Sequence, residues 1–144
     1  MPQASPHFSI GELTATSCGL DNTPNVEQGA ALVRLAVSCL EPMRALVGPL
    51  RINSGFRSPE VNRHVGGVIT SQHLRGEAAD IDPVEVSPSV LFDLTRVSQI
   101  PFDQLILEPN WVHVSCAPVG KIPQHQVLKA RVTTKGMVYE PIRG

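Results

Sequence analysis

The stretch SQHLRGEAAD, residues 71–80, is the most chemically distinctive run in this sequence. It places His73 and Asp80 seven residues apart, with Gly76 between them. A tight turn at the glycine would bring the imidazole and the carboxylate to one point. Imidazole nitrogen and carboxylate oxygen both bind Zn²⁺ well, at about 2.0–2.2 Å. Such a pair is more often a hydrogen-bonded pair on the protein surface, so the spacing alone suggests a metal site without defining one.

A third candidate ligand lies in WVHVS, residues 111–115, which alternates like a β-strand. In a strand, His113 faces one side while Val112 and Val114 face the other. Three protein ligands leave one position of a tetrahedral zinc ion open, which is the arrangement of a catalytic zinc. A strand histidine that is simply packed among its neighbours is the more common alternative.

Apolar periodicity predicts a helix over residues 26–46. Proline and N-cap signals predict two further helices, over residues 59–64 and 88–98. Pro42 interrupts the first of these three helices, and a proline inside a helix costs about 3 kcal/mol unless the helix kinks there. Strand patterns cover residues 50–53, 78–81, 104–107, 111–115 and 126–132. The third and fourth of these strands form a hairpin around residues 109–110.

The two ends of the chain carry weaker patterns. Residues 1–27 contain turn signals and predict irregular structure, from which Phe8, Ile10 and Leu13 fold back onto the core. Residues 117–144 show only the strand pattern already named. Helices beside a small antiparallel sheet predict an α+β fold, and 144 residues correspond to one domain, residues 1–144.

Composition excludes several classes of protein. Apolar residues make up 42% and charged residues 17% of the chain, which is typical of a globular protein. The net charge of -1, without a dense Lys/Arg block, does not favour a nucleic-acid partner. The three cysteines are scattered without a CxxC pair, so we expect buried thiols rather than disulfides or cysteine zinc ligands. No apolar run predicts a signal peptide or a membrane-spanning helix.

The motif resembles the SxHxxGxAxD signature of peptidase family M15, the zinc D-Ala-D-Ala carboxypeptidases, whose fold also occurs in hedgehog-type domains. Every signature position is filled, by Ser71, His73, Gly76, Ala78 and Asp80. Further segments are similar to motifs of the same family, and these are LEPMR at 40–44, SGFRS at 54–58, Val61-Asn62, VGG at 65–67 and WVHVS at 111–115. The resemblance spans about residues 8–116 and is closest to the small phage-associated or prophage-associated branch. It implies an α+β fold of the hedgehog/DD-peptidase type, with a small antiparallel sheet and flanking helices.

The resemblance also implies roles for individual residues. His73, Asp80 and His113 would hold one Zn²⁺ per chain. Arg57 would bind a carboxylate of the substrate or polarise its carbonyl, since a guanidinium binds carboxylates in a two-pronged manner. Ser71 would hydrogen-bond the substrate, with Gln72 beside it. Outside this context Arg57 would be interpreted as a solvated surface residue and Ser71 as a cap.

The general base is the point where this chain departs from the family pattern. Better-studied branches carry a glutamate three residues before the last zinc histidine, and here that position is Asn110. An amide cannot take a proton from water, so we assign the base to Glu108, the nearest carboxylate. The alternative for Glu108 is an exposed charge in the hairpin, and Asp82 and Asp103 are the other candidate bases.

By resemblance, the chain is a zinc metallopeptidase that hydrolyses the stem peptides of bacterial peptidoglycan. It would act as a D-Ala-D-Ala carboxypeptidase or as a cell-wall endopeptidase of the endolysin type. The alternatives are a non-catalytic zinc-binding domain, such as a phage virion component, and a cytosolic dipeptidase. We expect a monomer that is synthesised in the cytoplasm without a signal peptide and reaches the wall by another route, such as phage lysis.

Overall fold

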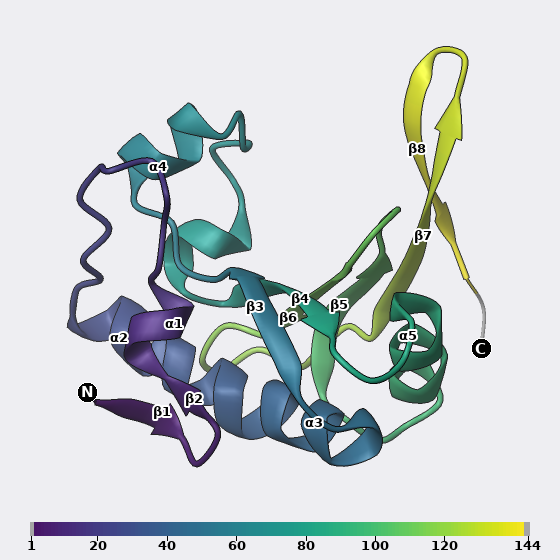
Figure 1. The fold of residues 1–144 in the computed structure, drawn as a ribbon, viewed down its shortest axis with the longest axis horizontal. Helices are drawn as coiled ribbons and strands as arrows, with labels where there is room; N and C mark the ends of the chain where they lie inside the picture. The colour runs from purple at the N-terminus through teal and green to yellow at the C-terminus, as the bar shows by residue number, and fades with distance from the viewer. Residues whose placement is uncertain (1, 143–144) are drawn as a thin grey trace.

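Within residues 2–142, which the computed structural model describes, a six-stranded sheet forms the centre of the fold (Figure 1). Its strands lie in the order β3-β4-β6-β5-β7-β8. Neighbours are antiparallel throughout, except that β5 and β7 are parallel. The bounds are β3 (Leu50–Ser54), β4 (Ala78–Pro83), β5 (Phe102–Leu107), β6 (Val112–Cys116), β7 (Gln126–Thr133) and β8 (Gly136–Pro141).

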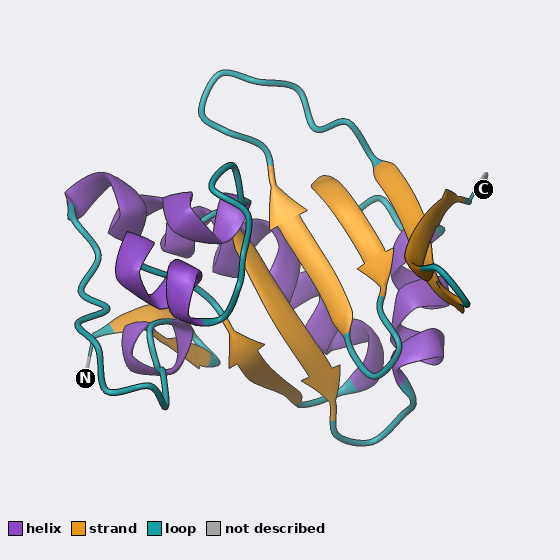
Figure 2. Ribbon diagram, turned by 90° about the horizontal axis from the view of Figure 1, so that it is seen from above, coloured by secondary structure: helices purple, strands orange, loops and turns teal. Residues whose placement is uncertain are grey.

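Helices cover one face of this sheet and leave part of the other face open. The helical elements of the fold are α1 (Ile10–Leu13), α2 (Val26–Leu35), the π-helical η1 (Ala36–Leu40), α3 (Glu41–Val47), α4 (Pro59–His64), the 3₁₀ turn η2 (Gln72–Arg75) and α5 (Pro88–Arg96). Of these, α4 and η2 lie on the side of the open face. Figure 2 shows strands in the centre with no helix in front of them and helices behind. Ile81, Leu105, Val112 and Val114 point into the core on the covered face and are fully buried. Because side chains alternate along a strand, the residues between them face the open side.

The α+β fold expected from the sequence is confirmed, as are the helix at 59–64 and the 104–107/111–115 hairpin. The helix expected over 26–46 is continuous but contains the π-helical segment 36–40. Pro42 lies in the first turn of α3, immediately after that segment. A proline has no N–H for the helical ladder, and the wider π turn is where the chain absorbs that defect.

Two expectations about the ends of the chain were wrong or incomplete. Residues 1–27 are not irregular throughout, because β1 (Gln3–Ser5) pairs with β2 (Phe8–Ser9) and α1 follows. Ser9 and Glu12 form a reciprocal capping box at the start of α1, which fixes this short helix. Phe8 and Leu13 are buried in the core, as the sequence predicted.

The C-terminal region forms a β-hairpin, β7–β8, where the sequence predicted a single strand. Most residues of β8 are exposed, so they carry no alternating apolar pattern that would have marked a strand. Figure 1 shows this hairpin rising on one side of the open face, with α4 on the other side. Among residues 2–142, no helix combines the length and the apolar character needed to cross a membrane.

Candidate metal centre

His73, Asp80 and His113 meet on the open face of the sheet. Each offers one ligand atom, and these atoms lie within 4.8 Å of one another. Asp80 and His113 are direct register partners on β4 and β6, while His73 comes from η2. The two imidazole rings lie edge to face, with their centroids 5.3 Å apart. The structure therefore brings together all three ligand candidates chosen from the sequence.

Gly76 makes the turn that joins η2 to β4 and thereby sets the approach of His73 to Asp80. Its φ of +73° is in the left-handed region that favours glycine. A Cβ atom at this position would also lie 2.5 Å from the carbonyl oxygen of Gln28, in α2. Both the backbone conformation and the close approach of α2 thus require glycine at the centre of the motif.

The hydrogen bonds of His73 define which of its nitrogens is available as a ligand. The side chain is buried, and its Nδ1 lies 2.7 Å from the carbonyl oxygen of Gly55. A carbonyl only accepts, so Nδ1 carries the proton and donates. The other nitrogen, Nε2, lies 3.5 Å from Oδ1 of Asp80. Metal-binding histidines commonly use this arrangement, in which a backbone carbonyl orients the ring from behind.

The Asp80 carboxylate contacts three side chains, those of His73, His113 and Arg57. Its Oδ1 lies 2.9 Å from Nδ1 of His113, and its Oδ2 lies 3.5 Å from Nη2 of Arg57. Burial alone would raise the pKa of Asp80, but its contacts with the His113 and His73 imidazoles outweigh that effect and hold the pKa well below its usual range. The carboxylate is therefore ionised at neutral pH. Two imidazoles and one carboxylate form a donor set that fits zinc.

Arg57 is held rigidly beside this centre. Its Nε donates to Oγ of Ser54 at 3.1 Å, and its Nη1 donates to Oδ1 of Asn62 at 3.1 Å. Burial lowers the pKa of the guanidinium, and the charge of Asp80 opposes that shift, so Arg57 remains a cation. A Cβ at Gly67 would collide with Asn62 and Arg57, so the glycine of the VGG segment leaves room for this contact.

Glu108 directly follows β5, next to the turn of the hairpin. Its backbone N–H donates to the carbonyl of Trp111 at 2.9 Å, and its Oε1 accepts from the Tyr139 hydroxyl at 3.1 Å. The residue is half-buried, and this burial raises the pKa of its carboxyl. Asn110, at the position where the resemblance expects a base, is exposed in the turn.

The other two candidate bases have different partners. Asp82 lies on β4 opposite Arg51, with an Oδ2 to Nη1 distance of 3.8 Å. Asp103 accepts from the backbone N–H of Gln124 at 3.0 Å and from Nε2 of Gln72 at 3.3 Å. Among the described residues, Glu108 lines the cavity above the centre, and Asp82 and Asp103 do not.

Ser71 and Gln72, the expected substrate contacts, also line this cavity, but both have partners within the protein. Oγ of Ser71 accepts from the backbone N–H of His73 at 3.2 Å and caps η2. The Gln72 amide donates to Asp103. Ser71 thus has the structural role considered as its alternative, while its position still exposes it to a bound molecule.

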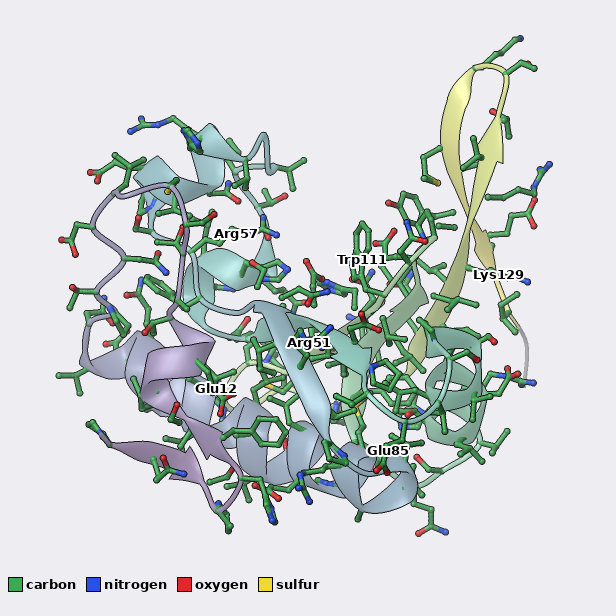
Figure 3. All side chains as sticks on the ribbon, viewed as in Figure 1. Glu12, Arg51, Arg57, Glu85, Trp111 and Lys129 are labelled. Atoms are coloured by element: carbon green, nitrogen blue, oxygen red, sulfur yellow. The ribbon has the colours of Figure 1, made fainter. Side chains whose placement is uncertain are left out.

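The cavity above the centre has a volume of about 860 Å³. Residues 65–68, after α4, form one wall, and Leu128 and Tyr139 of the β7–β8 hairpin form part of the other. Arg57 and Trp111 also line it, with Arg57 nearer α4 and Trp111 nearer the β7–β8 hairpin (Figure 3). The sequence did not point to Leu128 or Tyr139, because no local pattern links the C-terminal region to the motif.

Comparisons with known proteins extend these observations. The family model described as Peptidase M15 matches residues 6–115, which is more than half of the chain. A stretch of 44 residues is 46% identical to the zinc D-Ala-D-Ala carboxypeptidase of Streptomyces albus G. That stretch covers 29% of this chain and only 17% of the relative, so the similarity to the Streptomyces protein is local.

Proposed function

This chain belongs to the peptidase M15 family, and on that premise we propose that it is a zinc-dependent peptidase acting on bacterial peptidoglycan stem peptides. The observation that carries the proposal is the convergence of His73, Asp80 and His113 in a cavity that Arg57 and Glu108 also line. The name of the similar Streptomyces protein supports both the metal and the class of substrate.

The two imidazoles and the carboxylate would hold the zinc ion. A zinc ion in this position supplies Lewis-acid chemistry, because it polarises a carbonyl oxygen and makes water a stronger nucleophile at neutral pH. Gly55 orients His73 through its carbonyl, and His113 is fixed by the pairing of β6 with β4. These partners hold the ligands in place before a metal or substrate arrives.

Glu108 acts as the general base in this proposal. It removes a proton from water in the cavity and returns a proton to the leaving amine. Burial raises its pKa, so its carboxylate is a stronger base than that of an exposed glutamate. Its half-buried side chain lines the cavity beside the hairpin turn, which supports this role.

Arg57 binds the substrate. Its contacts with Ser54 and Asn62 fix the plane of the guanidinium, which has N–H groups to spare beyond those two bonds. A fixed cation in the cavity favours a substrate with a free carboxylate, such as a stem peptide ending in D-Ala-D-Ala. We therefore propose cleavage of the terminal D-Ala-D-Ala bond, and internal cleavage is the alternative that the experiment must separate.

A non-catalytic zinc-binding domain is the second candidate function. It is favoured by Asn110, which stands where the resemblance expects a carboxylate base. In this case the cavity would bind wall peptides without hydrolysing them.

The test uses zinc-loaded protein and synthetic stem peptides with either a free or an amidated C-terminus, analysed by mass spectrometry. Release of D-Ala from the free-acid peptide alone supports the carboxypeptidase, and cleavage of both peptides indicates an endopeptidase. Zinc-loaded protein that binds the peptides but cleaves neither them nor purified peptidoglycan would support the binding domain. His113→Ala serves as the matched control, because the proposed mechanism requires its imidazole.

A further inference from the structure

The β7–β8 hairpin lies outside the region that the family model matches, yet it reaches the proposed site. The match ends at residue 115, whereas Leu128 and Tyr139 line the cavity. Figure 1 shows the hairpin standing beside the open face of the sheet. A segment that supplies cavity residues beyond the shared part of the family is a candidate for a role specific to this chain.

The pairing of the strands brings Tyr139 close to Glu108. Leu107 is paired with Lys129 across the parallel strands β5 and β7, so Glu108 comes next to Ala130. Ala130 is in turn paired with Tyr139 across β7 and β8. Glu108, the residue that follows β5, therefore lies in one row with Ala130 of β7 and Tyr139 of β8, on one face of the sheet.

A hydrogen bond completes this arrangement. The Tyr139 hydroxyl donates to Oε1 of Glu108 at 3.1 Å, and Tyr139 is the one tyrosine in the chain. Burial, and then the negative charge of Glu108, raise the pKa of Tyr139, so the hydroxyl keeps its proton at neutral pH. It can therefore donate to the carboxylate throughout the neutral range.

The base of the hairpin is anchored to β5 and to the segment before it. Nε2 of His125 lies 2.8 Å from the carbonyl oxygen of Ile100, and its ring stacks on Phe102 with centroids 4.0 Å apart. The Gln104 amide donates to Oε1 of Gln126 at 2.9 Å. These contacts hold the strand that pairs with Tyr139 in a defined position relative to β5.

From this geometry we propose that Tyr139 is a positioning residue, which holds the Glu108 carboxylate toward the metal centre. The proposal rests on the proposed function, since it assigns Tyr139 a part in that same reaction. Glu108 has a flexible side chain next to an exposed turn, and without a partner it would sample several rotamers. The hydrogen bond to Oε1 restricts it and leaves Oε2 to accept the proton from water. The β7–β8 hairpin thus supplies the residue that positions the general base.

A double-mutant cycle tests this proposal, using Tyr139→Phe, Glu108→Gln and the double variant in zinc-loaded protein. Tyr139→Phe removes the hydroxyl and keeps the ring. We expect it to lower kcat by about tenfold with KM within about twofold, because the base is misplaced rather than the substrate lost. In the Glu108→Gln background the same change should have no further effect on kcat, since both act through one group.

Arg131→Gln is the control for general damage to the hairpin. It breaks the exposed pair of Arg131 with Glu140 on the same two strands and does not touch Glu108. We expect it to leave kcat unchanged. An equal loss in Arg131→Gln, or a tenfold loss that persists in the Glu108→Gln background, would overturn the proposal.

A spectroscopic measurement separates this proposal from the proposed function. The ¹³C carboxyl signal of Glu108, assigned by its absence in Glu108→Gln, should shift in Tyr139→Phe and stay in place in Arg131→Gln. If the parent hydrolyses peptides but the Glu108 signal does not shift in Tyr139→Phe, only the positioning role is overturned. A parent that cleaves no wall fragment overturns the proposed function and the positioning role with it.

Discussion

Asp80 and His113 are direct register partners on neighbouring antiparallel strands, with Oδ1 of one 2.9 Å from Nδ1 of the other. The pairing of β4 with β6 therefore builds two thirds of the candidate ligand set. The third member, His73, reaches the same point through the turn at Gly76. Because backbone hydrogen bonds fix this geometry, the centre is preorganised on rigid elements.

The first prediction concerns the metal content. We expect the protein to hold one zinc ion per chain, and His113→Ala to lose it, because two ligands bind zinc weakly. Elemental analysis after reconstitution and dialysis measures this directly. His64→Ala removes an exposed histidine at the end of α4 and should retain the metal. Equal zinc content in both variants would contradict the ligand assignment.

Arg57 provides the second prediction. Arg57→Ala should keep zinc but lower kcat/KM by about 10²-fold or more, because a preorganised cation is lost. Arg57→Lys should also be impaired, since an ammonium cannot make the two-pronged contact of a guanidinium. Steady-state kinetics with zinc analysis test both variants, and the exposed Arg63→Ala serves as control. Full activity in Arg57→Lys would exclude a role as a carboxylate clamp.

For Glu108 we expect Glu108→Gln to reduce turnover by about 10²–10⁴-fold, the usual contribution of general acid–base catalysis. Glutamine keeps an acceptor oxygen for Tyr139, so zinc content should hold and stability should change by no more than about 0.5 kcal/mol. Turnover and thermal unfolding of parent and variant check this. If Glu108→Gln retains turnover, Glu108 is not the general base, and Asp82 and Asp103 become the candidates.

The pH dependence of the parent follows from the raised pKa of Glu108. A general base works only when deprotonated, so kcat/KM should fall as the pH drops through this pKa. Because burial raises the pKa, the acid limb should lie above the ordinary glutamate value of about 4.3. A pH–rate profile of kcat/KM measures its position, and an acid limb at or below that ordinary value would contradict the environment described for Glu108.

Glycine substitutions test the turn at the motif. Gly76→Ala should destabilise the protein by more than about 1 kcal/mol, because of the positive φ and the collision with Gln28. Gly29, inside α2, has no atom within 4 Å of its added Cβ. Gly29→Ala should therefore stabilise by about 0.5–1 kcal/mol. Denaturant unfolding of the two variants should give shifts of opposite sign.

Thiol reactivity provides a separate check on the core. Burial raises the pKa of Cys39 to about 12 and that of Cys116 to about 11, and both side chains are buried. Cys18 is only half-buried, contrary to the expectation of three buried thiols, and a hydrogen bond from Thr16 lowers its pKa. A thiol-specific reagent should modify one cysteine in the native protein and three after unfolding. If the native Cys18→Ser variant still reacts rapidly with the reagent, one of the other two thiols must be accessible, which would contradict this packing.

Local patterns in the sequence sufficed for much of the fold. Apolar periodicity indicated the helical run that contains α2 and α3, and alternation indicated β6 with Val112 and Val114 facing the core. These signals are readable because each depends on residues only a few positions apart, whose periodicity reflects one buried face. The proximity of His73 and Asp80 could be predicted from the sequence for the same reason, since a single turn at Gly76 joins them.

Tertiary structure alone decided the features that depend on distant residues. The sequence named Glu108 but had no signal for its partner, because Tyr139 reaches it through a parallel pairing of β5 with β7 and the return of β8. The short β1–β2 pair was missed for a similar reason, since its stability comes from packing against the core rather than from its own residues. Periodicity records which face of an element is buried, but strand register across long loops is set by the global packing of the chain. The ligand candidates could therefore be named from the sequence, whereas the hairpin that completes the cavity around them could not.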